Sequence, residues 1–115
     1  MNHHNTNRKF GRVRKVRNAL LKSLALSLVL HGKITTTDAK ARELRPYAEK
    51  MVTQGRSDTV TARRLLSAKI GLPGTLKLIK DISPRYAKRA GGYTRITKLP
   101  RRKSDGSLMA VIEFV

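Results

Sequence analysis

Residues 85–96 read RYAKRAGGYTRI and combine residue types that can bind a large anion. Four of the twelve are Lys or Arg, two are Tyr, two are adjacent Gly, and none is acidic. Arg offers a planar fork to phosphate oxygens and Lys a mobile point charge. Gly91 and Gly92 lack side chains, so a sugar-phosphate strand could approach their backbone closely. The segment is therefore a candidate phosphate-binding site.

Two other interpretations of these residues stay open. The glycines also fit an ordinary loop with positive φ angles. Tyr86 and Tyr93 could stack on bases or hydrogen-bond a phosphate, but single aromatic residues commonly pack in a core instead. A nucleotide-binding glycine loop is not indicated, because GxxxxGK[ST] and GxGxxG are both lacking and the segment precedes a predicted strand.

The sequence offers no set of residues for catalysis. There is no cysteine, which excludes disulfides and thiolate metal sites. His3, His4 and His31 have no well-spaced carboxylate partner, and the seven acidic residues form neither an acid/base pair nor a Ser/His/Asp group. We therefore expect no enzyme activity, catalytic residue, metal site, cofactor or small-molecule substrate.

Net charge is the dominant property of the chain. There are 26 Lys and Arg residues against 7 Asp and Glu, a net charge of +19 over 115 residues. Residues 1–37 and 82–104 each carry eight basic residues and no acid, so sixteen of the 26 cations lie in two acid-free stretches. A free domain would repel itself at this charge density, which favours a polyanionic partner.

The first third of the chain predicts a basic arm, a helix and a strand. Residues 1–11 have almost nothing to bury and are typical of an N-terminal arm. Between residues 12 and 31 apolar residues recur at helical steps, at Val13, Val16, Leu20, Leu24 and Leu28. Gly32 can end that helix, and the β-branched run 33–37 predicts a strand.

Three further helices are predicted in the middle. One spans about 38–53, is capped by Thr37 or Asp38, and should be kinked or shortened by Pro46. Its apolar stripe is Ala41, Leu44, Ala48, Met51 and Val52. The next opens at 57–58 and runs to about 69, and a turn at 71–74 leads to a short helix at about 73–81. The inward residues expected for the helix ending at 69 are Val60, Leu65, Leu66 and Ala68.

The end of the chain predicts a β-hairpin. Residues 93–100 and 108–115 read as strands around a basic loop that contains the turn signal Asp105-Gly106. The second strand is nearly continuously apolar, which suggests a central strand packed by helices, with Glu113 on its less buried face. A small sheet with helices against it is the economical architecture.

Several motifs together resemble one known family. They are MNHHNTNRKFGR at the start, ALLKSLALSLVLHGKITTTDAKARELRPYAEKMVT, RSDTVTARRLL, PRYAKRAGGYTRITKL and the final MAVIEFV. The chain resembles, nearly from end to end, the bacterial large-subunit ribosomal protein family called L-seventeen. The most specific part of the resemblance is the stretch from Arg89 to Arg95.

The resemblance implies a structural constituent of the large ribosomal subunit that binds its ribosomal RNA and contacts neighbouring ribosomal proteins. It implies a two-layer α/β fold with a small, mixed, three-stranded sheet in the order α-β-α-α-α-β-β. Residues 12–115 would form one domain behind the arm 1–11. The location would be the cytoplasmic ribosome, with an organellar ribosome left open.

We hypothesise that the domain clamps RNA through two basic surfaces. The arm and the first half of the first helix would form one, through Arg8, Lys9, Arg12, Arg14, Lys15 and Arg17. The Gly-Gly segment and hairpin tip would form the other, through Arg85, Lys88, Arg89, Gly91, Gly92, Tyr93, Arg95, Arg101, Arg102 and Lys103.

Two alternatives share the charge of this hypothesis. One is a DNA-binding architectural protein of the nucleoid. The other is a membrane-active helix at 12–31, but its apolar stretch Leu20–Leu30 is too short to span a bilayer, and we expect no membrane partner.

Overall fold

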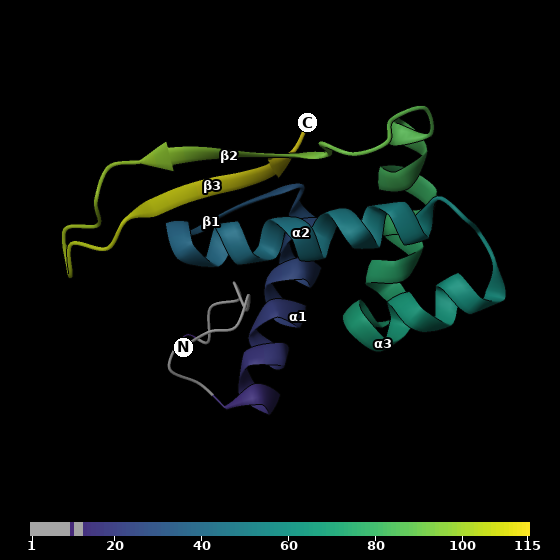
Figure 1. Cartoon of the computed structure of the whole chain (residues 1–115), viewed down its shortest axis with the longest axis horizontal. Helices are drawn as coiled ribbons and strands as arrows, with labels where there is room; N and C mark the ends of the chain where they lie inside the picture. The colour runs from purple at the N-terminus through teal and green to yellow at the C-terminus, as the bar shows by residue number, and fades with distance from the viewer. Residues whose placement is uncertain (1–9, 11–12) are drawn as a thin grey trace, which may run out of the picture.

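The computed structural model describes Phe10 and residues 13–115. The predicted arm, residues 1–11, lies outside the described residues except for Phe10. The elements along the chain are α1 (Arg14–His31), β1 (Lys33–Thr37), α2 (Asp38–Gly55), α3 (Val60–Lys77), a π-helical turn η1 (Leu78–Ile82), a 3-10 turn η2 (Ser83–Tyr86), β2 (Thr94–Leu99) and β3 (Met109–Phe114). The predicted α/β class and element order are confirmed (Figure 1).

The three strands form one sheet in the order β1-β3-β2, which confirms β3 as the central strand. Thr35 of β1 pairs with Val111, and Ile96 of β2 pairs with Ile112. Both pairings are antiparallel, so the expectation of a mixed sheet is wrong on that point. Strands β1 and β2 both run opposite to β3, which lies between them, so no neighbouring pair is parallel.

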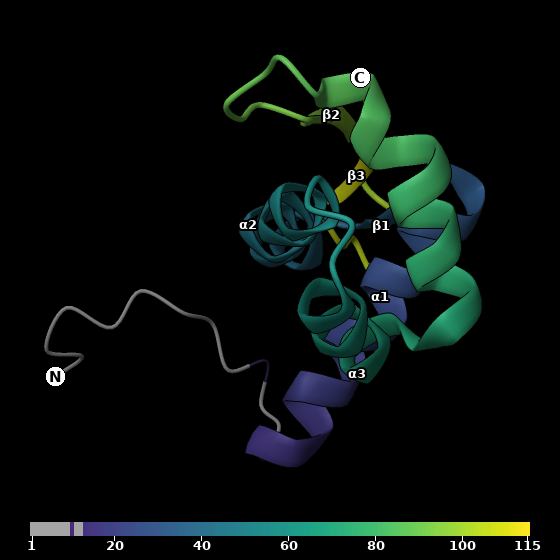
Figure 2. The same ribbon diagram turned by 90° about the vertical axis from the view of Figure 1, so that its right-hand side faces the viewer.

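Helix α2 packs along the sheet and supplies much of the core (Figures 1 and 2). Its five predicted apolar residues are all buried. On β3, Ala110 and Ile112 are fully buried, whereas Val111 and Glu113 are half-buried. This alternation is the period of two that a strand with one helix-covered face must show. Helix α2 thereby holds the sheet and the segment before β2 in one unit.

Pro46 does not shorten α2, which continues to Gly55. A proline inside a helix removes one backbone hydrogen bond, in this case the one to the carbonyl of Arg42. Pro46 and Arg42 are both exposed, so water can satisfy that carbonyl. Burial of Leu44 and Ala48 on either side holds the helix together.

The third and fourth predicted helices are joined as α3, with a single break at Gly71 (φ 74°, ψ 173°). Its side-chain cap is Thr59, which accepts from the amide of Ala62 at 3.1 Å, so the predicted start at 57–58 is one or two residues early. The buried face of its first half is Ala62, Leu66 and Ile70. Of the predicted inward residues, Leu66 is buried, but Val60 and Leu65 are 64% and 50% exposed and Ala68 is exposed too, so these three inward positions are wrong.

Helix α1 extends beyond the core at its N-terminal end (Figure 2). Ala25, Leu28 and Val29 are buried, but Val13 and Val16 are 69% and 51% exposed. The predicted apolar stripe is therefore correct only in the second half of the helix. At this end Arg14 and Lys15 are exposed to solvent and Arg17 is half-buried.

Candidate nucleic-acid interface

The predicted cationic residues lie in three separate places. We call them the helix start (Arg14, Lys15, Arg17), the glycine loop with its flanks (residues 85–95) and the hairpin tip (residues 100–108). Arg8, Lys9 and Arg12 lie outside the described residues. The glycine loop and hairpin tip were expected to form one surface, but they lie at opposite ends of β2 (Figure 1). Six strand residues separate them by about 20 Å.

The helix start is electrostatically unusual. Val13 provides no side-chain cap, and the first turn contains no acidic residue. The first amides of any helix lack intrahelical partners and form the positive end of its dipole. Cations at this end destabilise the isolated helix and are compatible with a bound anion.

The two glycines of the loop have different conformational roles. Gly92 has φ +67°, whereas Gly91 is outside the positive-φ region. A Cβ at either position would meet no atom within 4 Å. At position 92 the positive φ angle favours glycine. At position 91 neither the φ angle nor the packing favours glycine over other residues. Both face open space, and Lys88 and Arg89 beside them are exposed.

Tyr93 was predicted to contact RNA, but the structure buries it. Its side chain is 1% exposed, and its ring lies 5.1 Å from that of Tyr86, centroid to centroid. Its hydroxyl donates to the carbonyl of Arg89 at 3.0 Å and accepts from Arg56 at 3.1 Å. Hydrogen bonding with Thr53, followed by Arg56, lowers the pKa of Tyr93. No ring face remains for a base. Tyr93 instead lies under the glycine loop and holds it through the hydrogen bond to the carbonyl of Arg89.

Tyr86 is the second core aromatic under this loop. It is 4% exposed, and its hydroxyl donates to the carbonyl of Val115. Burial raises the pKa of Tyr86 above its usual value. Of the two functions considered for these tyrosines, core packing is the one the structure supports.

Two residues that the sequence did not single out for binding hold the glycine loop in place. Arg56, just after α2, donates to the carbonyls of Ala87 and Arg89, both at 2.8 Å. Glu49 of α2 accepts from the amide of Gly92 at 3.2 Å. These partners are 31 to 43 residues apart in sequence, so helical periodicity gives no signal for them. Glu49 also forms an ion pair with Arg45, one turn earlier on α2, at 3.2 Å.

A hollow beside the loop adds two further cations. It has a volume of about 390 Å³, and Lys50 of α2, Lys69 of α3 and Gly91 are among its lining residues. The ammonium of Lys69 lies 5.4 Å from the ring centroid of Tyr47. These lysines belong to the middle of the chain, where acids and bases are mixed, so charge runs in the sequence did not reveal them.

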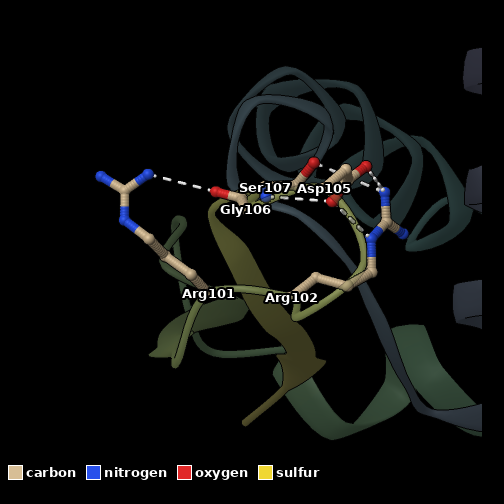
Figure 3. A network of polar contacts seen from close by, with 5 residues as sticks. All are labelled: Arg101, Arg102, Asp105, Gly106 and Ser107. Atoms are coloured by element: carbon tan, nitrogen blue, oxygen red, sulfur yellow. Dashed lines mark hydrogen bonds and ion pairs between the residues drawn. The ribbon is translucent and has the colours of Figure 1, made fainter.

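The hairpin tip is organised by Asp105 (Figure 3). Arg102 contacts both carboxylate oxygens, at 3.0 and 2.6 Å, and the amide of Ser107 donates to one of them at 3.0 Å. Arg101 donates to the carbonyl of Gly106, whose φ is +72°. The hydrogen bond from Arg102 is the main cause that holds the pKa of Asp105 well below its usual range. Arg102 thus shapes the tip, which carries exposed Arg101 and Lys103 at the end of the hairpin.

Two other predicted cations are paired on the surface. Arg85 lies 3.0 Å from Asp81, and Arg95 lies 3.4 Å from Glu113. Both arginine side chains stay at least half exposed. Exposed ion pairs of this kind contribute at most about 1 kcal/mol, so a phosphate can compete for these guanidinium groups.

Two properties of the described residues bear on other functions. Across Phe10 and residues 13–115, no three His, Cys, Asp or Glu side chains are grouped so that they could hold a metal ion. Within the same residues, no helix has the length and apolar character needed to cross a bilayer.

Comparisons with known proteins agree with the sequence resemblance. The profile of the family described as Ribosomal protein L17 matches residues 20–115. A protein of Persephonella marina named "Large ribosomal subunit protein bL17" is 48% identical over 118 residues, covering 100% of this chain and 95% of that protein. Its namesake in Sulfurimonas denitrificans is 46% identical over 116 residues, and all of both chains is covered.

Proposed function

The chain belongs to the ribosomal protein L17 family, and from this membership we propose that it is a structural constituent of the large ribosomal subunit. It works in the bacterial ribosome, in the cytoplasm. There it binds large-subunit ribosomal RNA and contacts neighbouring ribosomal proteins. It has no catalytic role in this proposal.

The observation that carries RNA binding is the placement of exposed cations at three separated points of one folded unit. The glycine loop and hairpin tip are about 20 Å apart along β2. The helix start lies at the far end of an 18-residue helix, which is about 27 Å long. A polyanion that folds around the protein can touch all three points. A compact folded RNA therefore fits this arrangement better than a ligand that would bind in a single groove of the protein.

The contacts at these points neutralise phosphates where RNA strands converge. Arg89, Lys88 and Lys103 are exposed on loops that the fold holds in place, and the amides of the helix start add positive dipoles. None of these groups forms a pattern that reads base edges. Recognition therefore depends on RNA shape and backbone rather than on base sequence.

A competition experiment tests this proposal against the nucleoid alternative. The full chain is titrated onto labelled large-subunit ribosomal RNA, transcribed from the genome that encodes it, with unlabelled duplex DNA as competitor. With about 6–10 phosphate contacts, the affinity should fall by about a thousandfold or more between 50 and 200 mM salt. DNA should compete poorly.

Two results would contradict the proposal. An affinity that stays flat across the salt series would show that phosphate contacts do not drive binding. Equal preference for the DNA duplex would favour an architectural DNA-binding protein instead.

A further inference from the structure

The glycine loop, residues 87–92, depends for its conformation on two side chains outside it. Arg56 donates to the backbone carbonyls of Ala87 and Arg89 in the loop, and Glu49 accepts from the backbone amide of Gly92. We propose that Glu49 and Arg56 are positioning residues for RNA binding, which hold this loop in the conformation that presents Lys88 and Arg89. This inference rests on the proposed function, because it assumes that the loop binds RNA.

The geometry of Arg56 supports a positioning role. Its Nη1 donates to the carbonyl of Arg89 at 2.8 Å and to the hydroxyl of Tyr93 at 3.1 Å, and its Nη2 donates to the carbonyl of Ala87 at 2.8 Å. A planar guanidinium can serve these acceptors together, whereas an ammonium is a point donor. In a chain with 26 cations, this arginine faces the protein's own carbonyls.

Glu49 is placed to hold the other end of the loop. One carboxylate oxygen accepts from the amide of Gly92, and the other accepts from the hydroxyl of Thr94 at 2.9 Å and from Arg45 at 3.2 Å. The side chain is 21% exposed. An acidic group beside an anion-binding loop should repel RNA, and the pairing with Arg45 reduces that repulsion. The negative charge of Glu49 thus weakens RNA binding, whereas its hydrogen bond to Gly92 strengthens RNA binding by holding the loop in place.

The positional gain follows from conformational entropy. A loop with two adjacent glycines and no anchors would sample many backbone states, and RNA binding would have to select one of them. A loop that is already ordered avoids that cost on binding. Loss of either anchor should therefore weaken RNA affinity by about tenfold, even where net charge is kept or raised.

Two substitutions separate positioning from direct contact. Arg56→Lys keeps the charge but removes the planar fork, in which Nη1 and Nη2 reach the carbonyls of Arg89 and Ala87 separately. It should weaken binding about tenfold and leave the salt slope unchanged, because the same phosphates are touched after the loop is ordered. Glu49→Ala removes a negative charge, so charge alone predicts tighter binding, whereas a positioning role predicts weaker binding.

Matched controls exist on the same helix and nearby. Arg42→Lys changes an α2 arginine that forms an ion pair with Asp38 at 3.0 Å, and this variant should bind like the wild type. Asp58→Asn removes a negative charge paired with Arg63 and should bind at least as tightly. Thermal melts of every variant show that the domain remains folded at the temperature of the binding experiment.

Hydrogen exchange of the free protein separates loss of loop order from general destabilisation, because general destabilisation would raise exchange in the core as well. In Arg56→Lys and Glu49→Ala, amide exchange should rise in residues 87–93 and stay unchanged in the core strand β3. Unchanged exchange in the loop would overturn the anchoring itself.

The binding outcomes decide the rest. Wild-type affinity in Arg56→Lys, or tighter binding in Glu49→Ala, would overturn the positioning role. If the wild-type chain fails to bind the RNA, the proposed function falls and the positioning role falls with it, while the exchange result still decides whether the two residues order the loop.

Discussion

At the scale of single residues, Gly91 and Gly92 are adjacent but answer different requirements. Gly92 has φ +67°, which costs a residue with a Cβ about 1–2 kcal/mol. Gly91 is under no such constraint, and neither residue is crowded by the protein. The pair therefore allows backbone strain and close approach of RNA to be tested separately.

Valine at each glycine should give different results. Gly92→Val should lower the free energy of unfolding by about 1–3 kcal/mol, because a β-branched residue disfavours positive φ. Gly91→Val should change it by less than about 0.5 kcal/mol and still impair incorporation into the large subunit. Urea denaturation and sucrose-gradient fractions measure the two effects. Normal incorporation of Gly91→Val would mean that RNA does not approach this backbone closely.

The acid titration of Asp105 tests the hairpin tip. Its folded pKa lies below the ordinary value of 3.8, mainly because Arg102 hydrogen-bonds the carboxylate. Since the folded pKa is lowered, the stabilisation is present above the ordinary value and is lost only as pH falls through the lower folded value. NMR titration of the carboxyl should show a midpoint below 3.8. Arg102→Ala should return the midpoint toward 3.8, and a wild-type midpoint already there would contradict the network.

At the scale of elements, the end of α2 packs closely against the turn before the glycine loop. A Cβ on Gly55 would lie 2.5 Å from Oγ of Ser83. Ser83 is 1% exposed and donates to the carbonyl of Val52 at 3.0 Å. This contact fixes where η2 begins, and therefore helps to place the glycine loop that follows it.

Gly55→Ala should destabilise the domain by about 1–3 kcal/mol, because the new methyl group must displace the buried Ser83 hydroxyl. In a Ser83→Ala background the same change should cost less, since the crowding oxygen is gone. Urea denaturation of the two single variants and the double variant gives the coupling. Additive costs would show that the methyl group is accommodated in another way.

The elements also show what the sequence could and could not predict. All five apolar residues predicted to face inward on α2 are buried, because that helix packs against the sheet and then against the neighbouring helical elements along its length. The same periodicity failed at Val13 and Val16, since it shows that a helix has an apolar side but not how far the core extends. On α3 it favoured Val60 and Leu65, whereas smaller Ala62 faces the core.

The candidate site shows the same division. Its cations were found because charge and glycine are visible in the sequence, but the anchors Glu49 and Arg56 were not. Their contacts with the loop join residues 31 to 43 positions apart, and such contacts depend on tertiary structure. The separation of the loop from the hairpin tip, by contrast, follows from the length of β2, and the predicted strand 93–100 already implied it.

At the scale of the whole molecule, a net charge of +19 is distributed over a body whose described part extends 43 Å along its longest axis. Cations at the helix start, the glycine loop and the hairpin tip point to different parts of the surroundings. A small core can support this arrangement because the repulsion is relieved when a polyanion surrounds the protein. We therefore expect all three groups of cations to be in contact with phosphates only when the protein lies inside a folded RNA.

The most direct test of this account is where the protein sediments in a cell lysate after protein–RNA crosslinking. We expect the chain in the large-subunit fraction, with crosslinks to ribosomal RNA from the glycine loop and hairpin tip. Absence of the chain from the large-subunit fraction, or recovery with DNA instead, would contradict the account.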